Sequence, residues 1–516
     1  MSAQATFPDR ERSRFPAVER IVATGPLAWL AVLVGGLGLG LFFWYATAAR
    51  LASFPAEAEL ALLISLAAGV LGVFAAWYAY GTYFARRAGI DLVTALRWDA
   101  ASWATLSLYG AGLVLPLAFG GPTRAAAYAV GAFVIAKVLV GARFVATVRD
   151  VLVTFIVTRI AIIVIAELAS ITIAQRPGHH VAESTNTLLA VWGRWDAVHY
   201  LDIAKRGYAG TDMAFFPLYP GLVRIVGNVV ENDLVAGLII SNAALFFGLL
   251  FFYKLVEHQY TRAVAHRAIF YISIFPTAIF FSAVYTESLF FALTVASFYY
   301  IREHRWVLAG AVGALAALTR SEGVLLAIPY AIEVVAAARA GGSLRAFLTT
   351  PQRLWRIVAG AALIPLGLAL YMGWLWVLNG DPLYFSHVQS HWNRKLAPPW
   401  VAFSHAYHVI ATAKSPLVVA NQSIEIVFTL LMIGVFCAGV VRMRPSYSAY
   451  MALSILVPMS TASLMSMPRF ALVLCPMFAI LAVWGGRSWV NNAIVAFSLP
   501  LLGLFTVLFA DWYWVA

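Results

Sequence analysis

The stretch "DVLVTFIVTRIAIIVIAELASITIA" (residues 150–174) is almost entirely apolar, and after Asp150 its only charged side chains are Arg159 and Glu167. A helix of about 20 apolar residues is long enough to cross the hydrocarbon core of a bilayer. Similar runs recur along the chain, in which 62% of the residues are hydrophobic and 11% are charged. Soluble domains carry about 25% charged residues. The sequence therefore predicts an all-α polytopic membrane protein with about 13–15 transmembrane helices. The predicted spans include residues 268–283, 286–301, 306–319 and 468–485.

Basic side chains mark one side of the predicted membrane. They cluster at alternate span boundaries, namely Arg86 with Arg87, Arg143 with Arg149, Lys254 with Arg262 and Arg267, Arg302 with Arg305, Arg353 with Arg356, and Arg442 with Arg444. By the positive-inside rule this side is cytoplasmic, together with an N-terminal tail that lacks a signal peptide pattern. The net charge of +12 thus reflects basic residues that set the topology and face the membrane surface. No nucleic-acid partner is predicted.

The opposite side of the predicted membrane receives the two longest polar loops. These are residues 175–232 and 379–418, and the short turns around Glu287, Arg320 and Arg469 join them. We expect a plasma-membrane protein, bacterial in type, whose chemically active residues face outside. The two cysteines lie inside apolar segments, so neither a disulfide nor a metal site is predicted.

The first of these loops contains an unusually polar and aromatic stretch, "WGRWDAVHYLDIAKRGY" (192–208). If it forms a helix, Trp195, His199 and Asp202 lie on one stripe of that helix and Asp196 with Tyr200 on another. Such a helix can lie at the membrane interface, with its aromatic rings among the lipid head groups. A carboxylate beside tryptophans at this depth could equally serve as a general base. The periodicity leaves both interpretations open.

The motifs around this stretch resemble those of the PIG-V family, which includes the second GPI mannosyltransferase. The resemblance starts with "WDAVHYLDIAKRGY" and "AFFPLYPGLVR" and continues in "FPTAIFFSAVYTESLF", "LAGAVGALAALTRSEGVLL", "GDPLYFSHVQSHWNRKLAPPW" and "SMPRFALVLCPMF". Together these motifs extend over roughly residues 150–485. Two positions depart from the family pattern: Glu322 replaces a small polar residue or asparagine, and His199 stands where tryptophan is frequent. Both departures concern the acceptor more than the type of reaction.

The resemblance implies a GT-C type glycosyltransferase that takes a sugar, usually mannose, from a polyprenyl-phosphate carrier in the bilayer and passes it to a glycan or glycolipid. The family's loop aspartate corresponds to Asp196, which is the predicted general base. Cationic or hydrogen-bonding groups are expected at the departing phosphate, and the candidates are Arg320, Arg469, Arg394, Lys395 and His391. Arg320 and Arg469 are preferred, because both lie at the outer ends of predicted spans, where a lipid head group would lie. The predicted substrate-binding residues are Trp195, His199, Tyr200, Glu287, Gln389 and Trp392.

The domain prediction separates residues 1–145 from a PIG-V-like core at 146–516. The first part holds the N-terminal tail and about four extra spans, to which the sequence assigns no role. No cofactor is predicted, because the lipid-linked sugar is itself the donor. A transporter or flippase of lipid-linked sugars is the alternative function. Transporters favour charged groups near the bilayer midplane and repeated halves, whereas the charges here gather in external loops.

Overall fold

The structure, a computed structural model, describes residues 16–51, 55–115, 119–173, 176, 186–340, 350–392 and 394–515. The first 15 residues of the predicted tail and part of the predicted loop 175–232 lie outside these ranges. Within them all regular elements are helices, and nine helices are long and apolar enough to cross a membrane. The predicted all-α polytopic membrane class is confirmed. By contact the chain forms two compact units, Met1–Arg149 and Asp150–Ala516.

The first unit consists of helices that mostly begin with proline. They are α1 (Pro16–Ala23), α2 (Pro26–Leu51), α3 (Pro55–Ala88), α4 (Leu92–Ala104), η1 (Thr105–Ser107), α5 (Leu108–Val114) and α7 (Pro122–Phe144). Proline is tolerated at the first helical position because the N–H groups of the first turn have no partner within the helix.

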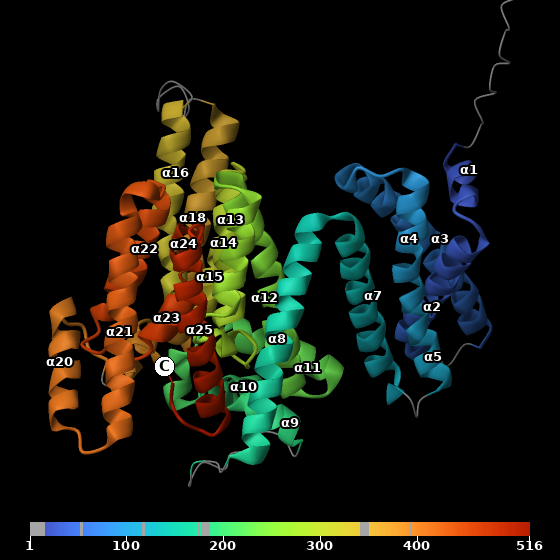
Figure 1. Cartoon of the computed structure of the whole chain (residues 1–516). Helices are drawn as coiled ribbons and strands as arrows, with labels where there is room; N and C mark the ends of the chain where they lie inside the picture. Colours follow the sequence, from blue (N-terminus) through green and yellow to red (C-terminus); the bar gives the residue numbers. More distant parts are fainter. Residues whose placement is uncertain are drawn as a thin grey trace, which may run out of the picture. The chain divides into compact units, whose positions relative to one another are not determined.

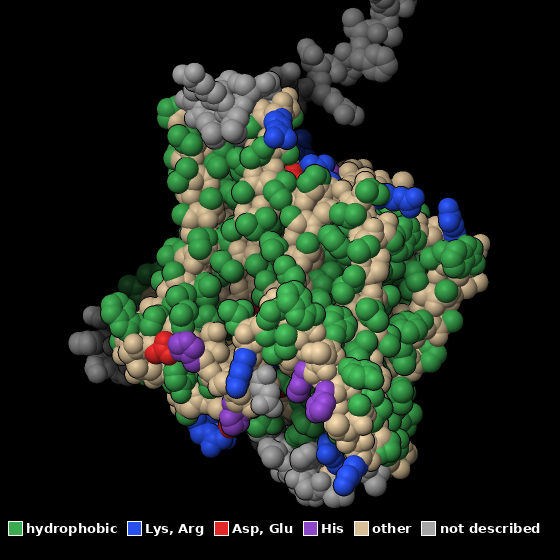
Figure 2. Space-filling model, turned by 90° about the vertical axis from the view of Figure 1, so that its left-hand side faces the viewer, with side chains coloured by type: hydrophobic (Ala, Val, Ile, Leu, Met, Phe, Trp, Pro, Cys, Tyr) green, Lys and Arg blue, Asp and Glu red, His purple; other side chains and the backbone are tan. Residues whose placement is uncertain are grey.

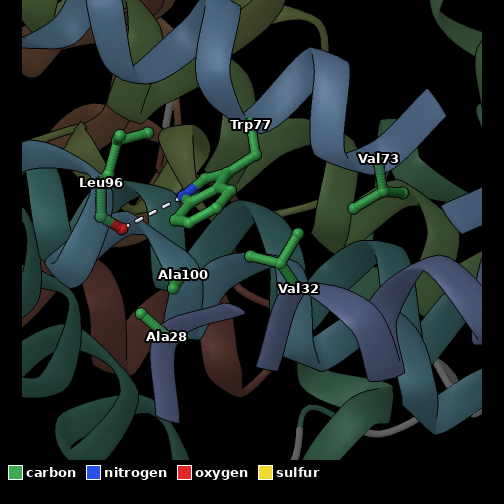
Figure 3. Packing of buried hydrophobic residues seen from close by; sticks show 6 residues of the cluster. All are labelled: Ala28, Val32, Val73, Trp77, Leu96 and Ala100. Carbon is green, nitrogen blue, oxygen red and sulfur yellow. Dashed lines mark hydrogen bonds between the residues drawn. The ribbon is translucent and has the colours of Figure 1, made fainter. Parts of the chain in front are cut away.

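The core of the first unit lies where α2, α3 and α4 meet (Figure 3). Its buried side chains are Ala28 and Val32 from α2, Val73 and Trp77 from α3, and Leu96 and Ala100 from α4. The fully buried Trp77 donates a hydrogen bond from Nε1 to the carbonyl oxygen of Leu96 at 3.1 Å, so its one polar atom is satisfied.

Two glycines allow α2 and α3 to pack closely. A Cβ added to Gly36 would lie 2.6 Å from the Cα of Val70, and one added to Gly40 would lie 2.7 Å from the Cα of Leu66. The glycine-rich "VGGLGLGLFF" (34–43) therefore supplies a helix-packing face rather than a nucleotide-binding loop.

The second unit contains the remaining helices. They are α8 (Ala146–Thr172), α9 (Thr187–Ala190), η2 (Val191–Gly193), α10 (Asp196–Arg206), η3 (Gly210–Ala214), α11 (Leu218–Val230), α12 (Asp233–Gln259), α13 (Arg262–Ser273), η4 (Ala278–Phe281), α14 (Glu287–Arg302), α15 (Trp306–Thr319), η5 (Ser321–Leu326), α16 (Ala327–Ala340), α18 (Pro351–Asn379), α19 (Tyr384–His387), η6 (Val388–Trp392), α20 (Pro399–Thr412), α21 (Pro416–Gly439), η7 (Val440–Arg442), α22 (Pro445–Met459), α23 (Met467–Leu472), α24 (Cys475–Trp484) and α25 (Ser488–Ala510).

The long helices of this unit run side by side, and the short ones gather toward one end of them (Figure 1). On the face shown in Figure 2, hydrophobic side chains are spread over the whole surface, and charged and histidine side chains lie mainly toward its two ends. Such a surface suits a protein whose middle is surrounded by lipid. The chain is an integral membrane protein.

The polar ends of this unit differ in chemistry. Helix α14 begins at Glu287 and ends at Arg302. At the Arg302 end, the carboxylate of Glu333 binds both Arg302 at 3.2 Å and Arg444 at 3.1 Å. These two arginines, which the sequence assigns to one side of the membrane, therefore meet. The Glu287 end carries the site described below.

Within the described ranges nine helices have at least 18 residues, compared with the 13–15 predicted spans. Some predicted spans form shorter continuous helices, such as α14 and α15, and others are interrupted. The span predicted at 268–283 is wrong. Helix α13 ends at Ser273, and an irregular segment with η4 follows. Pro276 accounts for the break, because it lacks an N–H and its ring clashes with the preceding turn. Likewise, the region predicted as a span at 468–485 divides into α23 and α24, with Pro476 at the start of α24.

Arg159 of α8 stabilises the irregular segment after α13. Its guanidinium donates to the carbonyl oxygens of Ser273 at 2.8 Å and Ala278 at 2.9 Å. Non-helical backbone is tolerated at membrane depth only where its polar groups find partners inside the protein. Arg159 is thus a structural residue, and its partners are these two carbonyls and the hydroxyl of Ser282 at 3.2 Å rather than Glu167.

Candidate active site

Asp196 is the first residue of α10, where a carboxylate complements the positive end of the helix dipole. The helix predicted from the polar stretch therefore exists. The preceding Trp195 has φ 59°, in the left-handed region that non-glycine residues rarely occupy. The hydroxyl of Tyr285 holds this turn, since it donates to the carbonyl of Arg194 at 3.1 Å and accepts from the N–H of Asp196 at 3.2 Å. Strain of this kind is often found at functional sites.

Arg469 joins Asp196 to a second carboxylate. Its Nη1 donates to Oδ2 of Asp196 at 2.7 Å, and its Nε donates to Oε1 of Glu287 at 2.8 Å. Glu287 is fully buried and also accepts from Nη1 of Arg320 at 3.2 Å. Burial disfavours the charge on Arg469, but Glu287 and Asp196 outweigh burial and raise its pKa above the ordinary value. The guanidinium therefore stays charged and is bound on two sides by carboxylates.

A buried acid fixes the turn that carries Arg469. The two carboxylate oxygens of Glu425 in α21 accept the backbone N–H groups of Ser466 and Met467, each at 2.9 Å. Thr277 donates to the carbonyl of Pro468 at 3.0 Å. Ser466 itself has φ 73°. These contacts hold the start of α23, and with it the position of Arg469.

A cavity of about 1290 Å³ opens beside this network. It is lined by Asp196, Arg320 and Arg469 from the network, and by Glu322, Arg394 and Lys395 around them. The carboxylate of Glu322, one of the two residues that depart from the family pattern, lies 3.7 Å from Nε of Arg320 and so adds a negative charge to the cavity. Four cationic side chains thus face two carboxylates in one hollow.

Arg394 binds uncharged groups, whereas Arg320 and Arg469 bind carboxylates. Its Nη2 donates to the carbonyl of Met465 at 3.0 Å, and its Nη1 lies 3.4 Å from Oε1 of Gln389. Burial lowers its pKa from the ordinary arginine value. Within the described ranges, no carboxylate lies at ion-pairing distance from Arg394 or Lys395. Arg394 is therefore not a solvated loop residue, and its charge is available to an anion in the cavity.

The predicted substrate-binding residues divide into two groups. Five of them line the cavity, namely Trp195, His199, Tyr200, Gln389 and Trp392. Glu287 lies behind the arginines instead, so its position suits holding Arg320 and Arg469 better than touching a substrate. His391, predicted at the phosphate, is not among the lining residues and packs its ring against Trp392 at 5.4 Å.

Several residues of the site have no counterpart in the sequence prediction. Trp512 and Trp514 near the carboxyl end line the cavity, and their rings lie 5.7 and 5.3 Å from that of Trp195. In Figure 1 the C label lies close to α23. Glu425 is the other missed residue. An acid inside an apolar span is a signal that could have identified it, whereas nothing in the local sequence marks the two tryptophans.

The chain is similar to known mannosyltransferases. Residues 136–344 match the family model described as "Mannosyltransferase (PIG-V)". The "GPI mannosyltransferase 2" of Cryptococcus neoformans var. neoformans serotype D is 32% identical in an alignment of 148 residues that covers 26% of this chain and 35% of that protein. The "GPI mannosyltransferase 2" of Schizosaccharomyces pombe is 26% identical in an alignment of 236 residues that covers 41% of this chain and 50% of that protein. The matches thus span between a third and a half of these relatives.

A comparison of structures gives a weaker similarity. The crystal structure of the Archaeoglobus fulgidus oligosaccharyltransferase, a complex with Zn and sulfate, aligns with 68% of this chain and 52% of its own. The TM-score is 0.31 and the sequence identity is 15%, too low to support an argument about the fold.

Proposed function

Because the chain is PIG-V-like over residues 136–344, we propose that it is a glycosyltransferase of the membrane. In this proposal it moves a sugar, mannose first among the candidates, from a polyprenyl-phosphate-linked donor to a hydroxyl group of an acceptor on the extracytoplasmic side. The observation that carries the proposal is the cavity in which Asp196 lies among four cationic side chains. This cavity lies at the Glu287 end of α14, and the basic cluster of Arg302 and Arg444 lies at the opposite end.

The reaction needs one base and one anion site. The acceptor oxygen attacks the anomeric carbon of the donor, a new C–O bond forms, and the bond to the phosphate oxygen breaks. The electron pair of that bond leaves with the lipid phosphate, and the proton of the acceptor hydroxyl passes to Asp196. Only Oδ2 of Asp196 binds Arg469, and no other side chain within the described ranges bonds to Oδ1. Oδ1 is thus the oxygen assigned to the proton.

The cations of the cavity stabilise the departing phosphate in this proposal. Arg394 and Lys395 are assigned to its oxygens, because no described carboxylate neutralises them. Arg320 and Arg469 already bind Glu287, and they add a positive field from the other side. This assignment changes the order of preference that the sequence suggests, in which Arg320 and Arg469 come first.

A transfer assay tests the proposal. The purified protein in lipid nanodiscs would receive polyprenyl-phosphate-linked mannose, glucose or arabinose in turn, or a nucleotide-linked mannose, with a glycoside as acceptor. We expect product from polyprenyl-phosphate mannose and none from the nucleotide sugar. Product from the nucleotide sugar alone would contradict the proposed donor. Movement of the lipid-linked sugar across the bilayer without any transfer would favour the transporter alternative.

A further inference from the structure

His199, which lines the cavity together with Asp196, is paired with an acid outside the cavity lining. Nδ1 of His199 lies 2.8 Å from Oδ1 of Asp212, which belongs to η3. His199 follows Asp196 by three residues on α10, and side chains at this spacing lie on adjacent stripes of a helix, about 5–6 Å apart at Cβ. Both Asp196 and His199 line the cavity. A single molecule bound there can therefore reach both side chains.

The imidazole ring has a fixed direction. It stacks on the ring of Phe215 with centroids 4.7 Å apart and planes inclined by 19°. Phe215 is itself held edge-on by Tyr200 at 5.1 Å and Trp392 at 6.2 Å. Two independent contacts, the stacked ring and the carboxylate, thus determine where the second ring nitrogen lies.

The carboxylate also determines the chemistry of that second nitrogen. An ionised carboxylate only accepts hydrogen bonds, so Nδ1 carries the hydrogen and Nε2 of the neutral imidazole is a hydrogen-bond acceptor. Within the described part of the chain no hydrogen bond engages Nε2, and the side chain is 36% exposed. Nε2 of His199 is therefore a hydrogen-bond acceptor with a fixed position, available to a ligand in the cavity.

We propose that His199, oriented by Asp212, binds the acceptor by accepting a hydrogen bond from one of its hydroxyl groups. This inference rests on the proposed function and adds to it the residue that places the acceptor against Asp196. The proton of the attacking hydroxyl still goes to Asp196, and the bond to His199 breaks no covalent bond. A ligand that lacks a donor group at this position would leave Nε2 without a partner, so the pair selects for a hydroxyl.

The test separates acceptor binding from chemistry. Octyl α-D-mannopyranoside, below its micelle concentration, serves as the acceptor probe for the protein in nanodiscs, with polyprenyl-phosphate mannose as the donor. His199→Phe keeps a ring to stack on Phe215 but removes Nε2, so the acceptor KM should rise about three- to tenfold. The donor KM and kcat should change by less than about twofold. His199→Gln, which retains a polar group at the end of the side chain, should recover part of the loss.

Two further variants sharpen the test. Asp212→Asn can donate a hydrogen to Nδ1 and so move the ring hydrogen to Nε2, and it should raise the acceptor KM like His199→Phe. His405→Phe makes the same change at an exposed histidine of α20 outside the cavity lining and should behave as wild type. An unchanged acceptor KM in His199→Phe would overturn the inference. A fall in kcat as large as that of Asp196→Asn would also overturn it, since His199 would then be the base.

A binding measurement distinguishes this inference from the proposed function. Quenching of tryptophan fluorescence by octyl α-D-mannopyranoside, without donor, reports binding because several tryptophans line the cavity. If the glycoside binds more weakly to His199→Phe but no donor gives product, the proposed function fails and the acceptor site stands. If transfer occurs with unaltered glycoside binding in His199→Phe, the acceptor site fails alone. A wild-type protein that does not bind the glycoside would overturn the acceptor site as well.

Discussion

At the scale of single residues, the charges of the cavity differ in what they are free to bind. Arg469 is shared between Asp196 and Glu287, at 2.7 and 2.8 Å. A phosphate that approaches Arg469 must compete with these carboxylates. Arg394 bonds to a backbone carbonyl and to the neutral amide of Gln389 instead. Neutral partners leave its positive charge uncompensated, so Arg394 is the residue whose loss should affect the phosphate most.

Replacement of Arg394 by alanine tests this distinction. A charge-assisted hydrogen bond to an anion contributes about 1.5–3 kcal/mol, so transfer should fall by roughly ten- to a hundredfold. Arg394→Lys should recover part of the activity, since it keeps the charge but not the planar fork. The control Arg206→Ala removes an exposed arginine that pairs with Asp202 and should have little effect. Rates of transfer from polyprenyl-phosphate mannose are the measurement, and a fully active Arg394→Ala protein would move the phosphate to Arg320 and Arg469.

The sequence predicted the chemistry of these residues better than their partners. The polar stretch at 192–208 predicted a helix that carries Asp196, and the aromatic residues around it do line a cavity. The pairing of Asp196 with Arg469 joins residues 273 positions apart, and no local pattern carries that information. The sequence predicts Glu287 as a substrate-binding residue, whereas the structure buries it behind Arg320 and Arg469. This burial depends on tertiary packing, which the local sequence does not show. The assignment of Asp196 as base stays a prediction.

At the scale of elements, the turn between α22 and α23 depends on one buried acid. Glu425 accepts two backbone N–H groups, from Ser466 and Met467. In Glu425→Gln the amide NH₂ group would face one of these donors and leave it without a partner. A buried donor without a partner costs about 1–3 kcal/mol, so we expect a lower unfolding temperature and, because Arg469 follows the turn, slower transfer.

Ser466→Gly provides the matched control for this prediction. It retains the N–H that binds Glu425, and glycine adopts φ 73° without strain. Thermal unfolding in detergent should therefore show a stability close to that of the wild type. If Glu425→Gln and Ser466→Gly unfold at the same temperature, Glu425 does not hold the turn.

The packing of α15 against α18 gives a second prediction for an element. A Cβ added to Gly360 of α18 would lie 2.3 Å from the carbonyl oxygen of Trp306 in α15, so backbone would have to move. Overpacking of this kind costs about 1–3 kcal/mol, and Gly360→Ala should lower the unfolding temperature. Gly373 lies on the same helix with nothing within 4 Å of an added Cβ. Gly373→Ala should be neutral or slightly stabilising, since alanine favours helix over glycine.

The sequence did not predict some helix ends correctly. Apolar composition alone suggested a span at 268–283, yet α13 ends at Ser273 and the next segment is irregular. Pro276 was the available signal. The compensating partner, Arg159 in α8, lies more than a hundred residues away, and only the fold brings it to the freed carbonyls. Hydrophobicity thus identified membrane segments well, but it did not identify where tertiary hydrogen bonds permit a helix to stop.

At the scale of the whole molecule, the predicted orientation in the membrane is open to direct measurement. Single cysteines would be introduced into a protein that lacks Cys437 and Cys475. A cysteine at Ser390, near the cavity, should react with an impermeant thiol reagent in intact cells. A cysteine at Glu303, which follows Arg302 at the other end of α14, should react only after permeabilisation. The opposite pattern would place the cavity in the cytoplasm and contradict the proposed donor side.

The central claim is that the protein transfers a sugar from a lipid-linked donor with Asp196 as the base, and one comparison tests it most directly. Wild type, Asp196→Asn and Asp202→Asn would be assayed for transfer from polyprenyl-phosphate mannose in nanodiscs, with their unfolding temperatures as a check on folding. Asp196→Asn keeps the shape of the side chain but cannot take the proton, so turnover should fall about 10²- to 10⁴-fold. Asp202→Asn, which loses only an exposed pair with Arg206, should stay close to wild type. A folded Asp196→Asn protein with wild-type turnover would contradict the claim.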